Sequence, residues 1–438
     1  MLFIASTHLI LPKKIFKTIC KKKKKKTGSI QEQKKLCSEG RMKKQSYQEQ
    51  IKTQLPASLC YPQCVVFNDE ILICGAYGQP KCYSFHVKQS TYKEICSYPS
   101  NVGLLGHSVV ECNDESSDND EKMTTLLSFG GEDKHTFVMK YKSVWDEKEP
   151  VKDMNRWSRV KNRVVFGFNR NERDDNLCGA RGLISGYNKN LLFVVYPPNE
   201  IDVIDLSSYE YVPNVSNKKI PQMIKSKRIE FSSFVPMTKY GKQITNEFIL
   251  TCEELNIWIK YDEMEKTFLY KFLPTFCLGV PLSFCGYTYI YDHILLFGGL
   301  NHNASQRSNS ISAYDMKNQQ WSNVSVLIPQ SISSCAVVIS PADYSLHIIG
   351  GRTYASELNS HYIIPIDKII QKNVNVSFFA FVIVWLLLSI LFDFWFVVCL
   401  QWTIAEIRII TGYWQHKCQF HRLGWIYDFE KIILLFLK

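Results

Sequence analysis

The sequence predicts an all-β fold made of about six similar units, and three observations support this. Short apolar runs recur along the middle of the chain, several of them ending in glycine, as expected for strands buried on both faces. The landmarks of each run return at intervals of about 47 to 64 residues, which is the length of a repeated supersecondary unit. Tyr and Phe are abundant, at 23 and 26 of 438 residues, and aromatic side chains favour strands.

The clearest unit lies between residues 294 and 321. An apolar run at 294–297 ends in Gly298 and Gly299, and a polar loop then leads to Tyr314 and, seven residues later, to Trp321. A glycine pair lets the chain turn sharply and lets neighbouring backbones approach closely. We therefore expect Tyr314 and Trp321 on two adjacent strands, where they fill the gap between units.

The same landmarks recur in five further units with varying regularity. Two of these units carry a Gly-Gly pair and one carries Gly-Ala, whereas the apolar runs at 191–195 and 248–250 lack the glycines. In chain order the landmarks are Gly75, Phe85 and Tyr92; Gly130, Gly131, Tyr141 and Trp157; Ile204 and Tyr211; Tyr261 and Phe268; and Gly350, Gly351 and Tyr362.

This pattern resembles the kelch motif, the repeat that builds one blade of a β-propeller. The resemblance implies a propeller of six four-stranded blades over residues 47–366, with the quoted glycines and aromatic residues serving structure. The chain is most similar to the divergent kelch-motif proteins that occur as large families in protists. The resemblance further implies a non-enzymatic module that binds a partner protein through the loops between its strands.

An apolar residue followed by proline ends several units. It occurs at Tyr98-Pro99, Leu273-Pro274 and Ile328-Pro329, and once more at Leu55-Pro56 with no unit before it. The last unit has no such ending. We therefore expect residues 50–56 to supply the outer strand of the last blade and so to close the ring.

The net charge of +11 is concentrated in one segment. Residues 1–46 include six consecutive lysines at 21–26 and almost no acidic residues, which predicts a disordered arm. This arm is a solvated tail, sequence upstream of the true start at Met42, or a tether to an anionic membrane or to nucleic acid. Because the remainder is nearly neutral, we expect no specific nucleic-acid footprint on the propeller.

A composition change follows the last unit. Residues 374–392 contain no charge and the apolar run continues to 402, which predicts a single membrane-spanning helix at 374–402 and a short tail at 403–438. The 15 scattered cysteines favour reduced thiols, and therefore a propeller on the cytosolic side of the membrane. In the alternative interpretation, the tail is translated non-coding sequence and the protein is soluble in the cytoplasm.

No catalytic pattern was found in the sequence. Phosphate-binding glycine loops, the GxSxG and HExxH patterns and paired CxxC motifs are missing. We therefore expect no enzyme activity, no cofactor, no metal site and no small-molecule substrate, but an unknown protein partner. The alternative is an enzyme on the same scaffold, because some kelch-like propellers resemble copper radical oxidases or sugar-processing enzymes.

Overall fold

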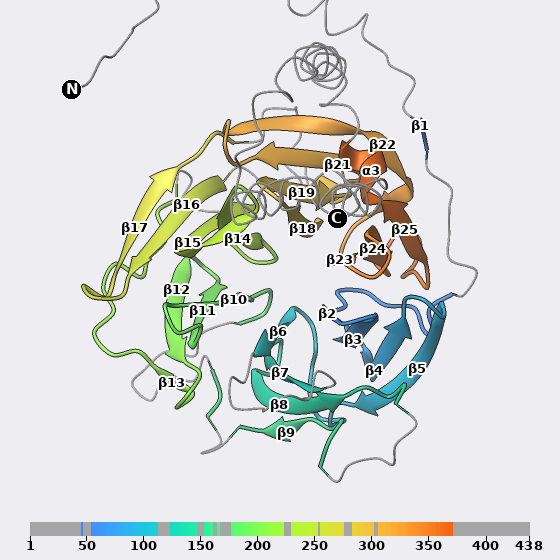
Figure 1. Cartoon of the computed structure of the whole chain (residues 1–438), viewed down its shortest axis with the longest axis horizontal. Helices are drawn as coiled ribbons and strands as arrows, with labels where there is room; N and C mark the ends of the chain where they lie inside the picture. The colour runs from blue at the N-terminus through green and yellow to red at the C-terminus, as the bar shows by residue number, and fades with distance from the viewer. Residues whose placement is uncertain are drawn as a thin grey trace, which may run out of the picture. The chain divides into compact units, whose positions relative to one another are not determined.

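Six antiparallel sheets stand side by side in a ring in the computed structural model of the chain (Figure 1). The structure describes residues 45–46, 54–112, 123–146, 153–160, 164–166, 177–222, 229–252, 255–275, 283–301 and 305–370. Each sheet is one blade, and its strands follow one another in sequence order from the axis outward, except in the fifth sheet, where residues 45–46 pair at the outer edge and residues 300–301 lie off this order. The predicted all-β propeller of six blades is therefore confirmed.

The first three blades each have four strands. The first is β2 (Cys64–Phe67), β3 (Glu70–Ala76), β4 (Gln79–His86) and β5 (Thr91–Ser97). The second is β6 (His107–Cys112), β7 (Met123–Gly130), β8 (His135–Lys142) and β9 (Ser158–Arg159). The third is β10 (Arg181–Ser185), β11 (Leu191–Tyr196), β12 (Glu200–Asp205) and β13 (Glu210–Tyr211).

The other three blades differ in strand number. The fourth is β14 (Ser233–Lys239), β15 (Lys242–Cys252), β16 (Leu255–Asp262) and β17 (Thr267–Phe272). The fifth is β18 (Gly286–Ile290), β19 (His293–Phe297), β21 (Gln306–Asp315) and β22 (Gln320–Ile332), with β20 (Leu300–Asn301) beside β21. Within the described residues the sixth has only β23 (Ala336–Ser340), β24 (Ser345–Ile349) and β25 (His361–Pro365), and α3 (Ile366–Ile370) follows it.

Each blade is buried on both faces because alternate side chains of a strand point to opposite neighbours. In β3, Ile71 and Ile73 pack with Ile349 of the sixth blade, whereas Leu72 and Cys74 pack toward Leu126 of the second blade. The described residues contain six hydrophobic clusters of this kind, one in each gap between blades. The short apolar runs of the sequence are these doubly buried strands.

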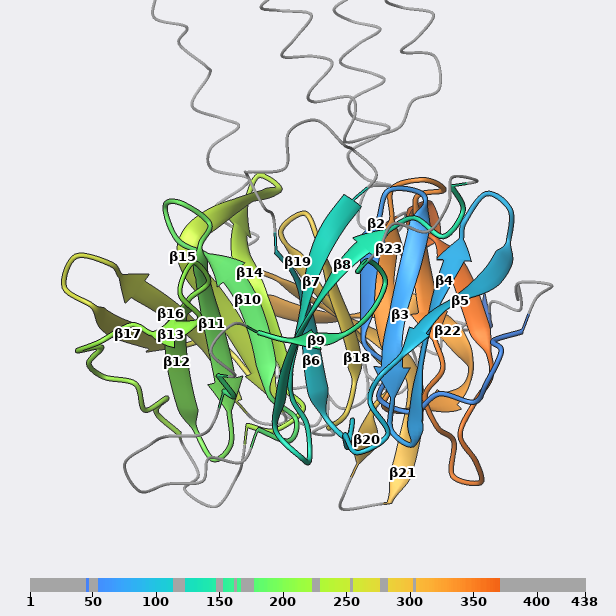
Figure 2. The same cartoon turned by 90° about the horizontal axis from the view of Figure 1, so that it is seen from below.

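The innermost strands lie next to one another all the way round, and β2 contacts both β6 and β23. Because neighbouring strands are antiparallel, the connections fall at two ends of the ring (Figure 2). We call one end the collar face; it carries the connections from second to third strands, such as 77–78 and 350–360, and the linkers between blades. The opposite face carries the remaining turns, such as 240–241.

The N-terminal segment meets the ring differently from the expected closing strand. Residues 47–53 lie outside the described residues, and residues 54–56 form no strand. The N–H of Leu55 instead donates to the carbonyl oxygen of Asn359 at 3.1 Å, in the connection between β24 and β25. Further upstream, β1 (Gln45–Ser46) pairs in parallel with β22 of the fifth blade, so pairing extends into the predicted arm. The closing strand at 50–56 stays a prediction.

The predicted membrane-spanning helix at 374–402 and the tail at 403–438 lie outside the described residues, as do residues 1–44. Within the part of the chain that the structure describes, no helix is both long and apolar enough to cross a bilayer.

Candidate functional site

The collar face is built around one backbone position that repeats in every blade. A residue one to three positions before each innermost strand has a left-handed conformation, with φ between 53° and 81°. Two of these positions are glycines, for which this conformation is cheap, but four carry side chains, which rarely adopt it. The six residues are Tyr61, Gly106, Gly179, Phe231, Phe284 and Ser334; we call them the collar.

Main-chain hydrogen bonds link neighbouring collar residues. The N–H of Gly179 donates to the carbonyl of Gly106 at 2.8 Å, and the N–H of Phe231 donates to that of Gly179 at 2.9 Å. Across the seam between the last and first blades, the N–H of Tyr61 donates to the carbonyl of Ser334 at 2.9 Å. Each of these bonds requires the collar carbonyl of the preceding blade to point along the ring. The left-handed backbone conformation of the collar residue gives its carbonyl this direction and so joins the blades.

Three aromatic collar residues meet where the ring axis leaves this face. The ring centroids of Tyr61 and Phe231 are 4.9 Å apart, although these residues come from the first and fourth blades. Phe284 of the fifth blade completes the group, 4.9 Å from Phe231 and 5.9 Å from Tyr61. All three are only partly buried, so the cluster offers an apolar surface at the centre of the collar face.

Two arginines flank this cluster on the side of the fifth and sixth blades. The Nε of Arg307 donates to the hydroxyl of Ser333 at 2.9 Å, and the backbone of Ser333 exchanges hydrogen bonds of 3.1 and 2.9 Å with Arg352. The Nε of Arg352 is buried and has no hydrogen-bond partner within the described residues. Glu357 pairs with Arg352 through the backbone. The two guanidinium groups give this side of the collar a cationic rim.

A third arginine, Arg181, is the first residue of β10, the innermost strand of the third blade. Its guanidinium carbon lies 5.9 Å from the ring centroids of both Phe231 and Tyr287, and its Nη1 donates to the carbonyl of Ala180 at 2.9 Å. Arginine over aromatic faces is a stable arrangement that leaves further donors available. The collar therefore combines aromatic area with fixed cations.

The groups at this site are poor nucleophiles. Burial, followed by the charge of Glu357, raises the pKa of the Cys60 thiol to about 11, so the reactive thiolate is scarce at neutral pH. Burial also raises the pKa of Tyr61. Within the described residues no three His, Cys, Asp or Glu side chains lie close enough together to hold a metal ion. Ten cysteines of the described part are thiols, among them Cys64, Cys74 and Cys82.

The motif residues singled out from the sequence lie in the gaps between blades and not at the collar. Phe85 faces Tyr92, Tyr261 faces Phe268 and Tyr314 faces Trp321 across neighbouring strands, with ring centroids 4.8, 4.9 and 4.9 Å apart. Trp157 does not face Tyr141; it stacks on Tyr98 of the first blade at 4.6 Å. Tyr362 accepts a 2.5 Å hydrogen bond from Gln330 of the fifth blade.

The motif glycines sit where one blade touches the linker of the next. A Cβ atom at Gly298 would lie 2.2 Å from the carbonyl oxygen of Ile332, and one at Gly350 would lie 2.4 Å from that of Leu59. Gly130 abuts the carbonyl oxygen of Leu177 and Gly75 abuts the side chain of Leu104, while Gly131, Gly299 and Gly351 continue each turn with positive φ. These glycines allow close packing of neighbouring blades.

Comparison with known proteins agrees with this architecture. Residues 281–325, which include most of the fifth blade, match the family model described as the kelch motif. Among solved structures, the one titled "Structure of YjhT" superposes with a TM-score of 0.51 at 12% identity, covering 72% of this chain and 97% of that chain. At that identity the likeness shows the fold alone. The comparison with curated proteins gives no match.

Proposed function

The chain is a kelch-repeat β-propeller protein, and we propose that it is a non-enzymatic module that binds a partner protein through the loops of its collar face. The observation that supports this most is the collar itself. Aromatic rings at its centre and arginines at its rim are the residue types that dominate protein interfaces. They are also held rigidly by hydrogen bonds between blades, which lowers the entropy lost on binding.

The arginines favour an acidic partner segment. Arg307 and Arg352 both flank Ser333, so their charges act on the same region. A partner carboxylate that approaches these two guanidinium groups would form charge-assisted hydrogen bonds with them. Apolar side chains next to that carboxylate could then cover Tyr61 and Phe284. We therefore expect an extended segment with alternating acidic and apolar residues.

Charge reversal at the rim tests the proposal. Purified protein is used to capture partners from native lysate, and each captured protein is quantified by mass spectrometry. The variant R307E/R352E should retain less than about one tenth of a specific partner, because two charge-assisted contacts are lost. K239E/K242E makes the same change in net charge on the opposite face, where both lysines are exposed, and should retain the partner. Equal retention by both variants would contradict the proposal, provided that both melt like the wild type.

We also propose that the C-terminal segment anchors the propeller at a membrane, with the propeller on the cytosolic side. The support is the charge-free stretch at 374–392 and the apolar run that continues past Asp393 to 402. Extraction of native membranes at alkaline pH separates the alternatives. An anchored protein stays in the pellet, whereas a protein that enters the supernatant is the soluble form that the alternative interpretation of the tail requires.

A further inference from the structure

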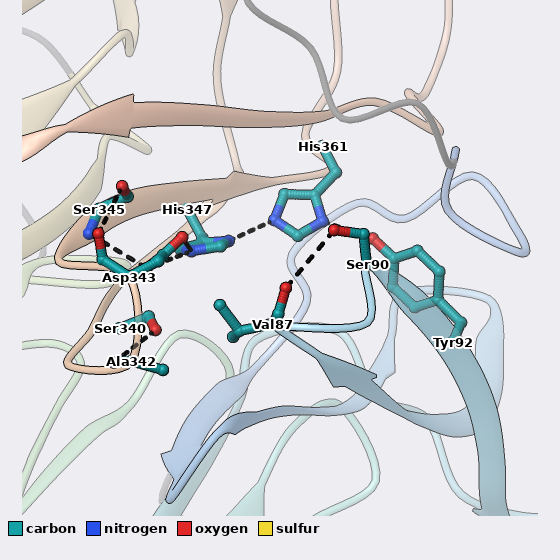
Figure 3. A network of polar contacts seen from close by, with 9 residues as sticks. All are labelled: Val87, Ser90, Tyr92, Ser340, Ala342, Asp343, Ser345, His347 and His361. Carbon is teal, nitrogen blue, oxygen red and sulfur yellow. Dashed lines mark hydrogen bonds and ion pairs between the residues drawn. The ribbon is translucent and has the colours of Figure 1, made fainter.

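Four polar side chains form a continuous chain of contacts between the last and first blades (Figure 3). Nε2 of His347 lies 3.1 Å from a carboxylate oxygen of Asp343, and Nδ1 of His347 lies 2.9 Å from Nε2 of His361. Nδ1 of His361 then contacts the hydroxyl of Tyr92, in β5 of the first blade. We call Asp343, His347, His361 and Tyr92 the relay.

The relay is buried where it crosses the seam. His347 and His361 are 0% and 3% exposed, and both pack against Phe85 of the first blade, with ring centroids 6.1 and 4.8 Å away. Asp343 lies at the outer end, with its side chain 31% exposed. Water therefore reaches the carboxylate, while the two imidazoles depend on each other and on Tyr92 for hydrogen bonds.

One set of tautomers satisfies every contact when both rings are neutral. The Tyr92 hydroxyl donates to Nδ1 of His361, Nε2–H of His361 donates to Nδ1 of His347, and Nε2–H of His347 donates to Asp343. One added proton on His347 can be accommodated, because Asp343 compensates its charge and the central bonds reverse direction. A second added proton cannot, because two N–H groups would then face each other across 2.9 Å.

The titratable groups around His347 and His361 offset one added positive charge but not a second. Burial alone raises the pKa of Asp343, but hydrogen bonds from His347, Ser340 and the backbone of Ser345, together with the charge of the His347 ring, outweigh burial and lower the pKa, so one carboxylate faces the pair. From the first blade, Tyr92 and the Cys64 thiol near it both have pKa values raised by burial and are neutral. Lys88 and Asp69, on neighbouring turns, pair with each other at 2.5 Å.

The relay is the polar side-chain network of the seam, and other links there are apolar or main-chain contacts. Within the described residues the sixth sheet has three strands, so β25 is its outer edge. The other links across the seam include the hydrophobic cluster around Leu59 and Ile349 and main-chain hydrogen bonds of the segment before β2, such as Leu59 N–H to the carbonyl of Leu358 at 2.9 Å. We propose that the relay is a proton-operated lock on the ring: it holds the first and sixth blades together when neutral and releases them when both histidines are protonated.

Hydrogen exchange at the seam tests this directly. After correction for intrinsic exchange rates, the amides of β25 and β5 in the full chain should lose protection about tenfold more than those of β16 between pH 7 and pH 5. In His347→Gln, the amide can donate to Asp343 and accept from His361, so the neutral relay is kept and the second charge is removed. This variant should lose protection at the seam no more than at β16.

His293→Gln is the matched control, because His293 lies 3.9 Å from Asp315 in the fifth blade and outside the seam. Between pH 7 and pH 5 this variant should lose amide protection at the seam to the same extent as the wild type. If His347→Gln opens at the seam like the wild type, or if the wild type opens evenly round the ring, the proposal is wrong. Should His347→Gln fail to fold, nitrogen-15 histidine spectra of the wild type decide. They should show Nε2-protonated tautomers for His347 and His361 at neutral pH, and the Nδ1-protonated tautomer at His361 would overturn the proposal.

Discussion

The N–H of Gly351, in the sixth blade, donates a 2.7 Å hydrogen bond to the carbonyl oxygen of Leu59, which precedes the first blade. Leu59 and Gly351 lie near opposite ends of the propeller sequence, so this bond joins the last blade to the segment before the first. The neighbouring Gly350 touches the same carbonyl, and Leu59 is fully buried beneath it. The two ends of the ring therefore meet backbone to backbone, at a place where only glycine fits.

Replacing Gly350 by alanine should strongly destabilise the ring. The new Cβ would lie 2.4 Å from the Leu59 carbonyl oxygen in a left-handed conformation, for a combined cost of about 3 kcal/mol or more. Gly78→Ala is the control, since Gly78 has a similar φ of +68° but nothing within 4 Å of an added Cβ, and should cost only about 1 kcal/mol. Urea unfolding measures both, and equal costs would mean that the close approach at Gly350 does not matter.

Two tyrosines at matching places in their blades should respond differently to loss of the hydroxyl. Tyr141 donates to the buried carboxylate of Glu70, so Tyr141→Phe should cost about 1 to 3 kcal/mol of unfolding free energy. The Tyr314 hydroxyl is buried and has no hydrogen-bond partner within the described residues. Tyr314→Phe should therefore change stability by less than about 0.5 kcal/mol. The reverse order in thermal or urea melts would refute this assignment.

Acid should unfold the propeller well above the range in which carboxylates titrate. Burial lowers the pKa of His107 to about 4 and that of His135 to about 3, and it lowers that of His361 far below its usual value. The unfolded chain takes up these protons near pH 6.5 and the folded chain does not, so stability is full above that pH and falls below it. His107 and His135 together predict a loss of about 5 kcal/mol between pH 7.5 and pH 4.5. A flat unfolding free energy down to pH 5 would show that these rings are protonated in the fold.

Truncation tests the predicted closing strand. A chain that starts at residue 47 lacks only the lysine-rich arm and β1, whereas one that starts at residue 54 also lacks residues 47–53. If residues 50–56 supply the outer strand of the sixth blade, the second chain should melt at least about 5 °C below the first. Identical melting temperatures would show that the sixth blade does without this strand.

The repeat and its strands could be predicted from the sequence because local chemistry specifies them. Gly298 follows a short apolar run, and residues seven apart, such as Tyr261 and Phe268, become partners because a short turn joins their strands. In the second blade an insertion lengthens the turn between the corresponding strands, so the seven-residue spacing does not predict a partner there. Trp157 consequently packs on Tyr98 of the first blade.

The collar and the relay could not be predicted in this way. Collar positions share a backbone conformation but not a residue type, since tyrosine, glycine, phenylalanine and serine all occur there. An alignment of the positions just before each innermost strand would have located the collar residues. It would not have revealed their left-handed φ. In the relay, Tyr92 and His361 are 269 residues apart, and only closure of the ring brings them together.

Site-specific photo-crosslinking tests most directly whether the collar face binds the partner. Tyr354 on the collar face and Tyr240 on the opposite face are 84% and 69% exposed, so either can be replaced by a photoreactive phenylalanine with little effect on the fold. In native extract, the probe at Tyr354 should link one specific protein, and R307E/R352E in the same chain should abolish that link. A specific product from Tyr240 with none from Tyr354 would contradict the account.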